Sequence, residues 1–207
     1  MLLLVSGATR TVSRLVREGR AEHLGVLLRP GNGNGPTSLP WGVDNGAFTG
    51  FDAAAFRALL AGVRGCPGCL FVAAPDVVGE GRATLALFDE WHVELRASGL
   101  PVAIVAQDGM TVESVPWDRV DAIFVGGSTA WKLGADARAI ALGARRRDRW
   151  VHFGRVNSLR RMRAVLSMGA QSIDGTKWSR WSDTFIPGGL ADLANIDRQV
   201  RIFDDAS

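Results

Sequence analysis

The chain has 207 residues, of which 47 % are apolar and 22 % are charged, and its formal net charge at pH 7 is +3. These values are typical of a globular protein and argue against a disordered or collagen-like chain. No apolar run approaches the roughly 18 residues of a membrane span, and the start MLLLVSGATR is too short an apolar block for a signal peptide. We therefore expect one domain over residues 1–207, a cytoplasmic location and no membrane partner.

Arginine dominates the basic residues, because only Lys132 and Lys177 among the 24 are lysines. The planar guanidinium group suits phosphates and stacked bases, so this bias permits a polyanionic partner. A GC-rich coding sequence would also favour arginine.

Eight short apolar runs recur along the chain, each followed by a turn-forming or polar cluster, and this pattern predicts buried parallel strands. In chain order the runs are Leu2–Val5, Leu24–Leu28, Trp41–Val43, Leu70–Ala74, Val102–Ala106, Ala122–Val125, Trp150–Phe153 and Gln171–Ile173. Three intervening segments have apolar residues at helical spacing and predict helices over residues 51–63, 81–98 and 156–169. Asp52 and Asn157 occupy the expected N-cap positions of the first and the third helix.

The alternation of strands and helices predicts an α/β fold with a parallel sheet. Eight such units favour a compact TIM-like (β/α)8 barrel with some helices shortened or missing. The alternative is an open doubly wound sheet, whose nucleotide-binding signature is weak here. VSGATR (residues 5–10) lacks the second and third glycines of G-x-G-x-x-G.

Two connectors have an unusual composition. GNGNGP (residues 31–36) has little to bury and predicts a surface loop, either a plain connector or a lid. CPGC (residues 66–69) holds both cysteines of the chain, and a structural zinc would need two further ligands that nothing nearby supplies. We expect free thiols and no metal.

Functional residues of a parallel barrel lie at the carboxyl ends of its strands. From the third predicted strand to the eighth, these ends carry Asp44, Asp76, Gln107, Gly126 with Gly127, Arg155, and Asp174. Crowded carboxylates acquire different pKa values, so one can act as a nucleophile while another transfers a proton. An amide beside a carboxylate can recognise a purine edge, and a Gly-Gly turn lets backbone N–H groups approach a carbonyl. The alternative for each aspartate is a helix cap or turn residue.

The motifs around these strand ends resemble those of the guanine transglycosylases. GVDNGAF resembles the family's DSGGF segment, IVAQDG its IVQGG segment, VGGS its GGL turn, and QSIDG its nucleophile-bearing strand. The combination of APDV, VAQDG, FVGGSTAWKLG, HFGRVNSLRR and SIDGT is most similar to the short phage-encoded members that act on DNA. The resemblance runs from Trp41 to Lys177 in the same order as in the family.

This resemblance implies a DNA-guanine transglycosylase, a pentosyltransferase that exchanges guanine in DNA for a 7-deazaguanine precursor such as 7-cyano-7-deazaguanine. Asp174 would be the nucleophile that forms a covalent aspartyl–sugar intermediate, and Asp44 would be the general acid/base. The residues implied to bind the base are Asp76, Gln107, Asn45, Gly126 and Gly127, with the glycine backbone at the base carbonyl. The partners would be DNA, free guanine and the free 7-deazaguanine base, without cofactor or metal. A phage-encoded enzyme would act in the host cytoplasm.

The chain departs from the family pattern in two places. The transfer-RNA enzymes carry a cysteine-rich zinc segment after the barrel, and no such segment follows Asp174, which favours DNA over tRNA. Asp108 also stands where the family's amide motif has glycine. It is either a fourth acid in the pocket or a cap of the next turn.

Contacts to the polymer are expected from Arg155 and from GTKWSRWSDTF, in which Lys177, Trp178 and Arg180 interleave charge with aromatic faces. Such a segment can hold a phosphate and stack a base that has left the helical stack. The alternative is a barrel-closing loop with one buried tryptophan.

His152 and the cluster RRRDR (residues 145–149) each have a structural and a functional interpretation. For His152 these are a core residue or an aid to proton transfer. The cluster is expected to be a solvated helix end on the rim opposite the active site. Trp131 follows the glycine pair and can wall a base pocket.

Three other functions remain alternatives at this stage. A tRNA-guanine transglycosylase would use the same residues, and a TIM-barrel glycoside hydrolase would also use paired acids. A non-catalytic nucleic-acid-binding module would bind a polymer in a salt-dependent manner without needing Asp174.

Overall fold

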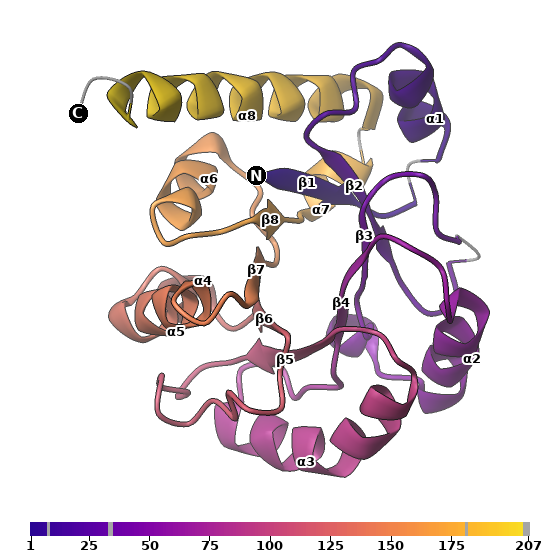
Figure 1. Ribbon diagram of the computed structural model, residues 1–207, viewed down its shortest axis with the longest axis vertical. Coiled ribbons are helices and arrows are strands. Elements are labelled where there is room, and N and C mark those ends of the chain that lie inside the picture. The colour runs from indigo at the N-terminus through magenta and orange to yellow at the C-terminus, as the bar shows by residue number, and fades with distance from the viewer. Residues whose placement is uncertain (8, 33–34, 181, 205–207) are drawn as a thin grey trace.

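The computed structural model describes residues 1–7, 9–32, 35–180 and 182–204, with the side chains of all of these except residues 9, 179–180 and 197–204. Within these ranges, eight parallel strands follow one another around a closed barrel in sequence order (Figure 1). The strands are β1 (Leu2–Val5), β2 (Leu24–Leu28), β3 (Trp41–Val43), β4 (Cys69–Ala73), β5 (Val102–Ala106), β6 (Ala122–Val125), β7 (Trp150–Phe153) and β8 (Ser172–Ile173). The predicted TIM barrel is confirmed, and the open doubly wound sheet is not what forms.

Helices surround the barrel as an outer layer (Figure 1). They are α1 (Thr9–Arg17), α2 (Ala53–Val63), α3 (Gly81–Ala97), α4 (Thr129–Lys132), α5 (Ala135–Arg145), α6 (Leu159–Leu166), α7 (Thr176–Arg180) and α8 (Ser182–Asp204), with a short 3-10 helix η1 (Ala47–Thr49). None of the helices in the described ranges has the length and apolar character that crossing a lipid bilayer requires.

Some barrel units lack a full helix, as the chain length predicts. Neither the described residues between β2 and β3 nor those between β5 and β6 form a helix. α4 has four residues and α7 has five. These omissions let a closed eight-stranded barrel form from a chain near the lower size limit of the fold.

The helix caps follow the sequence in one case and differ in another. The Asp52 side chain accepts a hydrogen bond from the Ala55 N–H at the start of α2, as predicted. At α6 the cap is Ser158, not Asn157. The side-chain oxygen Oδ1 of Asn157 instead accepts from the Lys177 N–H at 3.0 Å and so joins the loop after β7 to α7.

Two separate apolar cores stabilise the barrel. The inner core fills the barrel with Leu4, Leu27, Phe71, Ala73, Ala103, Val105, Ala122 and Phe124. A larger outer core lies between the strands and the helices. Gly42 on β3 leaves room for the inner core, because a Cβ atom there would lie 2.6 Å from the Phe71 ring. His152 is fully buried beside this core, with its ring centroid 4.8 Å from that of Phe71 and 4.5 Å from that of Phe124.

The barrel closes where β8 pairs with β1, with Leu2 opposite Ser172 and Leu3 opposite Ile173. Figure 1 shows α8 crossing this side of the molecule between α1 and α6. Ile186, Leu190, Leu193 and Ile196 of α8 are buried in the outer core. The last helix therefore covers the joint between the first and the last strand.

Candidate active site

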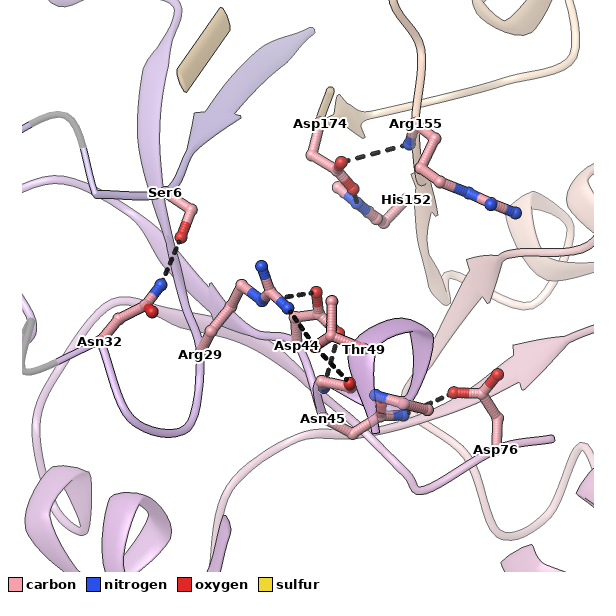
Figure 2. Close-up of polar contacts among 12 residues, drawn as sticks. Ser6, Arg29, Asn32, Asp44, Asn45, Thr49, Asp76, His152, Arg155 and Asp174 are labelled. Atoms are coloured by element: carbon pink, nitrogen blue, oxygen red, sulfur yellow. Dashed lines mark hydrogen bonds and ion pairs between the residues drawn. The ribbon is translucent and has the colours of Figure 1, made fainter. Parts of the chain in front are cut away.

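One cavity opens at the carboxyl ends of β3 to β8, on the face where TIM barrels hold their active sites. It holds about 490 Å³ of space not occupied by atoms, including the part open to solvent. Seven of the predicted site residues contribute to its lining: Asp44, Asn45, Asp76, Gln107, Gly126, Arg155 and Asp174. Phe48, Val105 and Phe124 add apolar walls. Figure 2 shows how the polar side chains converge.

Asp174 follows β8 and is held on both of its carboxylate oxygens. Oδ1 accepts a hydrogen bond from the Arg155 backbone N–H at 3.1 Å. Oδ2 lies 2.9 Å from Nε2 of His152 (Figure 2). Each oxygen still has an unused lone pair, so the carboxylate is fixed in orientation while it remains able to attack a ligand in the cavity.

His152 is more than a core residue, because a chain of hydrogen bonds links it to Asp174. The Trp150 indole N–H, which can only donate, lies 2.9 Å from Ser172 Oγ, and this hydroxyl lies 2.9 Å from His152 Nδ1. With the Ser172 hydroxyl donating to Nδ1, the ring proton is on Nε2 and points at Asp174. His152 thus combines features of both interpretations, since it is fully buried and also contacts Asp174. The sequence signal for this position is the alternation along WVHF, which places His152 inside the barrel.

Asp44 follows β3 and lines the same cavity as Asp174. Its Oδ1 accepts from the Gly46 N–H at 3.0 Å, and its Oδ2 lies 3.5 Å from Nε of Arg29. Burial raises the pKa of the Asp44 carboxyl, and the nearby charge of Asp174 raises it further. This environment favours the protonated form of the Asp44 carboxyl more than water does.

Arg29 was not predicted as a site residue. It follows β2, and its guanidinium Nη2 donates to the Thr49 hydroxyl at 3.1 Å while Nε faces Asp44 (Figure 2). An arginine directly after a predicted strand was the signal that the sequence offered.

Asp76 follows β4, and its carboxylate accepts hydrogen bonds from two amide side chains. The Asn45 amide donates to Oδ1 at 2.7 Å, and the Gln107 amide donates to Oδ2 at 2.6 Å. Burial is the largest influence on this carboxyl and raises its pKa. The arrangement presents a fixed row of donors and acceptors to the cavity.

The two amides are themselves oriented by the backbone. Asn45 also donates to the Ala74 carbonyl at 2.6 Å, and its own oxygen accepts from the Ala47 N–H at 2.7 Å. Both hydrogens of the Asn45 side-chain amide are therefore donated, one to Ala74 and one to Asp76. Asn45 positions Asp76 and has no amide hydrogen left for a ligand. Gln107 keeps one amide hydrogen for a ligand, while its oxygen accepts from the N–H groups of Gly79 and Gly127.

The glycine pair does not take the predicted role, because its N–H groups are already bonded within the protein. The Gly126 N–H donates to the Ala106 carbonyl at 2.9 Å, and the Gly127 N–H donates to Gln107 Oε1 at 2.7 Å. Gly126 leaves room for the Gln107 side chain, because a Cβ atom at this position would lie 2.7 Å from Gln107 Nε2. The pair thus orients Gln107 instead of meeting a base carbonyl directly.

Arg155 closes one side of the cavity mouth. Its backbone has a φ of 58°, a left-handed conformation that is unfavourable for a residue with a side chain and that is concentrated at functional sites. This conformation turns its N–H toward Asp174. Its guanidinium donates to the Gly127 carbonyl at 2.7 Å and lies 4.6 Å from the Phe48 ring centroid.

The segment after β8 departs from the predicted polymer contact. Trp178 is 3 % exposed, and its indole N–H donates to the Val156 carbonyl, so its faces are packed inside the protein. This matches the alternative interpretation, a closing segment with a buried tryptophan. The Lys177 ammonium lies 4.3 Å from the Phe185 ring centroid. The side chain of Arg180 and the whole of Trp181 lie outside the described residues.

Asp108 and Trp131 are both placed beside the cavity rather than in its lining. Asp108 accepts hydrogen bonds from the N–H and the hydroxyl of Ser128, each at 2.6 Å, so it caps the turn after β6. Trp131 packs over Gly127, where a Cβ atom would lie 2.6 Å from its ring.

Comparison with known proteins identifies the fold but no family. No protein-family model matches the sequence, and no curated protein is similar to it. Two structures of tryptophan synthase from the hyperthermophile Pyrococcus furiosus, of the A subunit and of the α2β2 complex, are similar with TM-scores of 0.57 and 0.58 at 14 % identity. In both cases 94 % of this chain and 97 % of the other are covered. Phosphoribosyl anthranilate isomerase from Thermus thermophilus has a TM-score of 0.48 at 17 % identity, over 95 % of this chain and all of the other. The chain therefore shares the TIM-barrel fold with the two tryptophan synthase structures, and this likeness says nothing about function.

Proposed function

We propose that this protein is a DNA-guanine transglycosylase, which replaces guanine in DNA by a 7-deazaguanine through a covalent aspartyl–sugar intermediate. The observation that carries the proposal is the arrangement of three carboxylates in one cavity, each in a different environment. Asp174 is hydrogen-bonded on both oxygens, Asp44 has a raised pKa, and Asp76 is clamped between two amides. These are the groups that nucleophilic displacement at a sugar carbon requires.

In the first half of the reaction, a carboxylate oxygen of Asp174 attacks C1′ of a deoxyguanosine in the polymer. The C1′–N9 bond breaks, and guanine leaves with the bonding electrons and takes a proton from the Asp44 carboxyl. The raised pKa of Asp44 supports this step, because it increases the fraction of protonated acid near neutral pH.

In the second half, the incoming 7-deazaguanine occupies the place of guanine. Its N9 loses a proton to the Asp44 carboxylate and attacks C1′, and the bond from C1′ to Asp174 breaks. Two displacements at C1′ retain the configuration of the sugar. The exchange neither oxidises nor reduces any group.

Recognition of the base is assigned to Asp76 and Gln107. A guanine edge presents N–H donors beside a carbonyl acceptor, and the Asp76 carboxylate with the free Gln107 amide hydrogen complements this pattern. A 7-deazaguanine keeps the same edge. The same two residues therefore serve both the leaving and the entering base.

The mechanism is tested by incubating DNA with labelled 7-deazaguanine or guanine and measuring the incorporated label by nucleoside mass analysis. We expect Asp174→Asn to abolish exchange and any covalent protein–DNA adduct without unfolding the protein. Asp44→Asn should slow exchange by about 10² to 10⁴-fold because proton transfer is lost. Asp118→Asn is the matched control, since Asp118 is exposed and precedes β6 on the opposite rim of the barrel.

The substrate is tested in the same assay with double-stranded DNA, single-stranded DNA, tRNA and an oligosaccharide. Label in DNA supports the proposal, whereas exclusive incorporation into tRNA or sugar release from the oligosaccharide contradicts it. Full exchange by the Asp174→Asn variant would remove the assignment of the nucleophile.

A further inference from the structure

Lys132, the last residue of α4, is a lysine almost removed from solvent. It is 5 % exposed, and its ammonium group donates a hydrogen bond to the Gly154 carbonyl, in the segment after β7. Among the described side chains, no carboxylate is in hydrogen-bond contact with this ammonium group. Burying such a lysine is costly, because the charged group loses its hydration. The cost of burying this charge points to a functional role for the Lys132 ammonium group.

The Gly154 carbonyl and the Arg155 N–H belong to the same peptide group. The carbonyl accepts from Lys132, while the N–H donates to Asp174 Oδ1 at 3.1 Å. Because a peptide group is planar, fixing the direction of its carbonyl also fixes the direction of its N–H. A positive charge at the carbonyl additionally polarises the group and strengthens the bond that its N–H donates.

We infer that Lys132 is a positioning residue for Asp174, acting through the peptide group between Gly154 and Arg155. This assignment rests on the proposed function insofar as Asp174 is the nucleophile. The hydrogen-bond chain itself does not depend on the reaction. It also accounts for the left-handed backbone of Arg155, because that conformation is what turns the N–H toward the carboxylate while the carbonyl faces the lysine.

The charged groups around Lys132 come from four elements. They are Arg155 in the segment after β7, Asp174 after β8, Arg161 on α6 and Asp108 after β5. Burial lowers the pKa of Lys132 to about 8, Arg155 and Arg161 lower it as well, and the two aspartates oppose the shift. The ammonium form is therefore present at neutral pH and is lost under mildly alkaline conditions.

The first test follows the Arg155 amide resonance by ¹H–¹⁵N NMR in the substrate-free protein. In the wild type we expect its shift to titrate near pH 8, as the charge on Lys132 is lost. In Lys132→Met the resonance should move upfield and lose this titration, and in Lys132→Gln, which keeps a donor without a charge, it should lie between the two. Arg138→Met, which removes an exposed charge from α5, should leave it unchanged.

The second test measures formation of the covalent adduct in a single turnover. Lys132→Met should slow it by about 10- to 100-fold, with unchanged affinity for the free base and a Tm no lower than that of the wild type. Lys132→Gln should slow adduct formation by a smaller factor, because glutamine keeps a hydrogen-bond donor.

The outcomes separate this inference from the proposed function. If the Arg155 resonance and its titration are unchanged in Lys132→Met, or if adduct formation keeps the wild-type rate, the positioning role is wrong even when the wild type exchanges guanine. If the wild type forms no adduct, the proposed function fails, while the NMR result still decides whether Lys132 polarises the bond to Asp174. Should Lys132→Met fail to fold, the wild-type titration and Lys132→Gln decide the same question.

Discussion

At the scale of single residues, the aspartates of the cavity are chemically identical and differ through their neighbours. Asp174 accepts a hydrogen bond from a backbone N–H and contacts a histidine ring. Asp44 accepts from one backbone N–H and faces a guanidinium group, and Asp76 accepts from two side-chain amides. Burial raises the pKa of Asp44 and Asp76. The proposed roles of Asp44 as acid and Asp174 as nucleophile, which the family resemblance implies, agree with these different environments.

The raised pKa of Asp44 has a consequence for stability. A carboxyl whose folded pKa exceeds its unfolded value of 3.8 stabilises the folded state below that value, and the contribution is lost as the pH rises through the folded pKa. At neutral pH the burial of the Asp44 carboxyl is thus a cost to stability that Asp44→Asn removes. We expect the variant to have the higher Tm at pH 7, with a difference that narrows as the pH falls toward 4.

Thermal unfolding of both proteins between pH 4 and pH 8 checks this expectation. A variant less stable than the wild type at pH 7 would mean that the contact between Arg29 and Asp44 outweighs burial. In that case burial would not favour the protonated Asp44 carboxyl, and Asp44 would be a poor proton donor.

At the scale of elements, each strand delivers its site residue to one face, and each helix that follows begins on that face. Residues in the first turn of such a helix therefore lie near the cavity mouth, and residues at its end lie on the opposite rim. The cluster at residues 145–149 ends α5 and precedes β7, so it lies on the opposite rim as predicted. Arg160, in the first turn of α6, lies on the mouth side and is exposed.

Under the proposed function, this arrangement predicts which arginine would contact the DNA backbone. Arg160→Ala should weaken DNA binding and reduce the slope of log affinity against log salt by about 1, because one phosphate contact is lost. Arg146→Ala is the matched control, since it removes an arginine that is also exposed but lies on the far rim. Fluorescence anisotropy over a series of salt concentrations measures both. Equal losses in the two variants would contradict binding at the mouth.

The elements also show where sequence patterns suffice. Strand positions follow from the apolar runs to within one residue, because a buried parallel strand needs continuous apolar sequence. The cap of α6 was wrong by one residue, since Asn157 is recruited by the Lys177 N–H from a distant segment. Propensity alone does not contain such a competing partner.

At the scale of the whole molecule, closure of the barrel rests on a short joint. β8 has two residues, and α8 packs over the side where β8 meets β1. Leu193 of α8 is fully buried in the outer core. Its side chain therefore contributes to the packing of α8 against the barrel.

Removing this side chain should destabilise the whole barrel. We expect Leu193→Ala to lower the free energy of unfolding by about 2–5 kcal/mol, because it deletes buried methyl groups and leaves a cavity. Val93→Ala is the control, since the Val93 side chain on α3 is 75 % exposed and its loss should change stability by less than about 0.5 kcal/mol. Urea unfolding followed by circular dichroism measures both, and a Leu193→Ala variant as stable as the control would show that α8 does not support the closure.

The amino-acid sequence by itself determined the number and order of the strands, the barrel and the polar residues at its carboxyl ends, because these depend on local apolar periodicity and on the uniform direction of parallel strands. Contacts between segments far apart in the chain were decided only by the tertiary structure. They include the ring of His152 on Asp174, the burial of Trp178, the committed N–H groups of the glycine pair and the peptide between Lys132 and Asp174. Hydrogen-bond partners and burial depend on which side chains the closed barrel brings together, and no pattern along one segment records that.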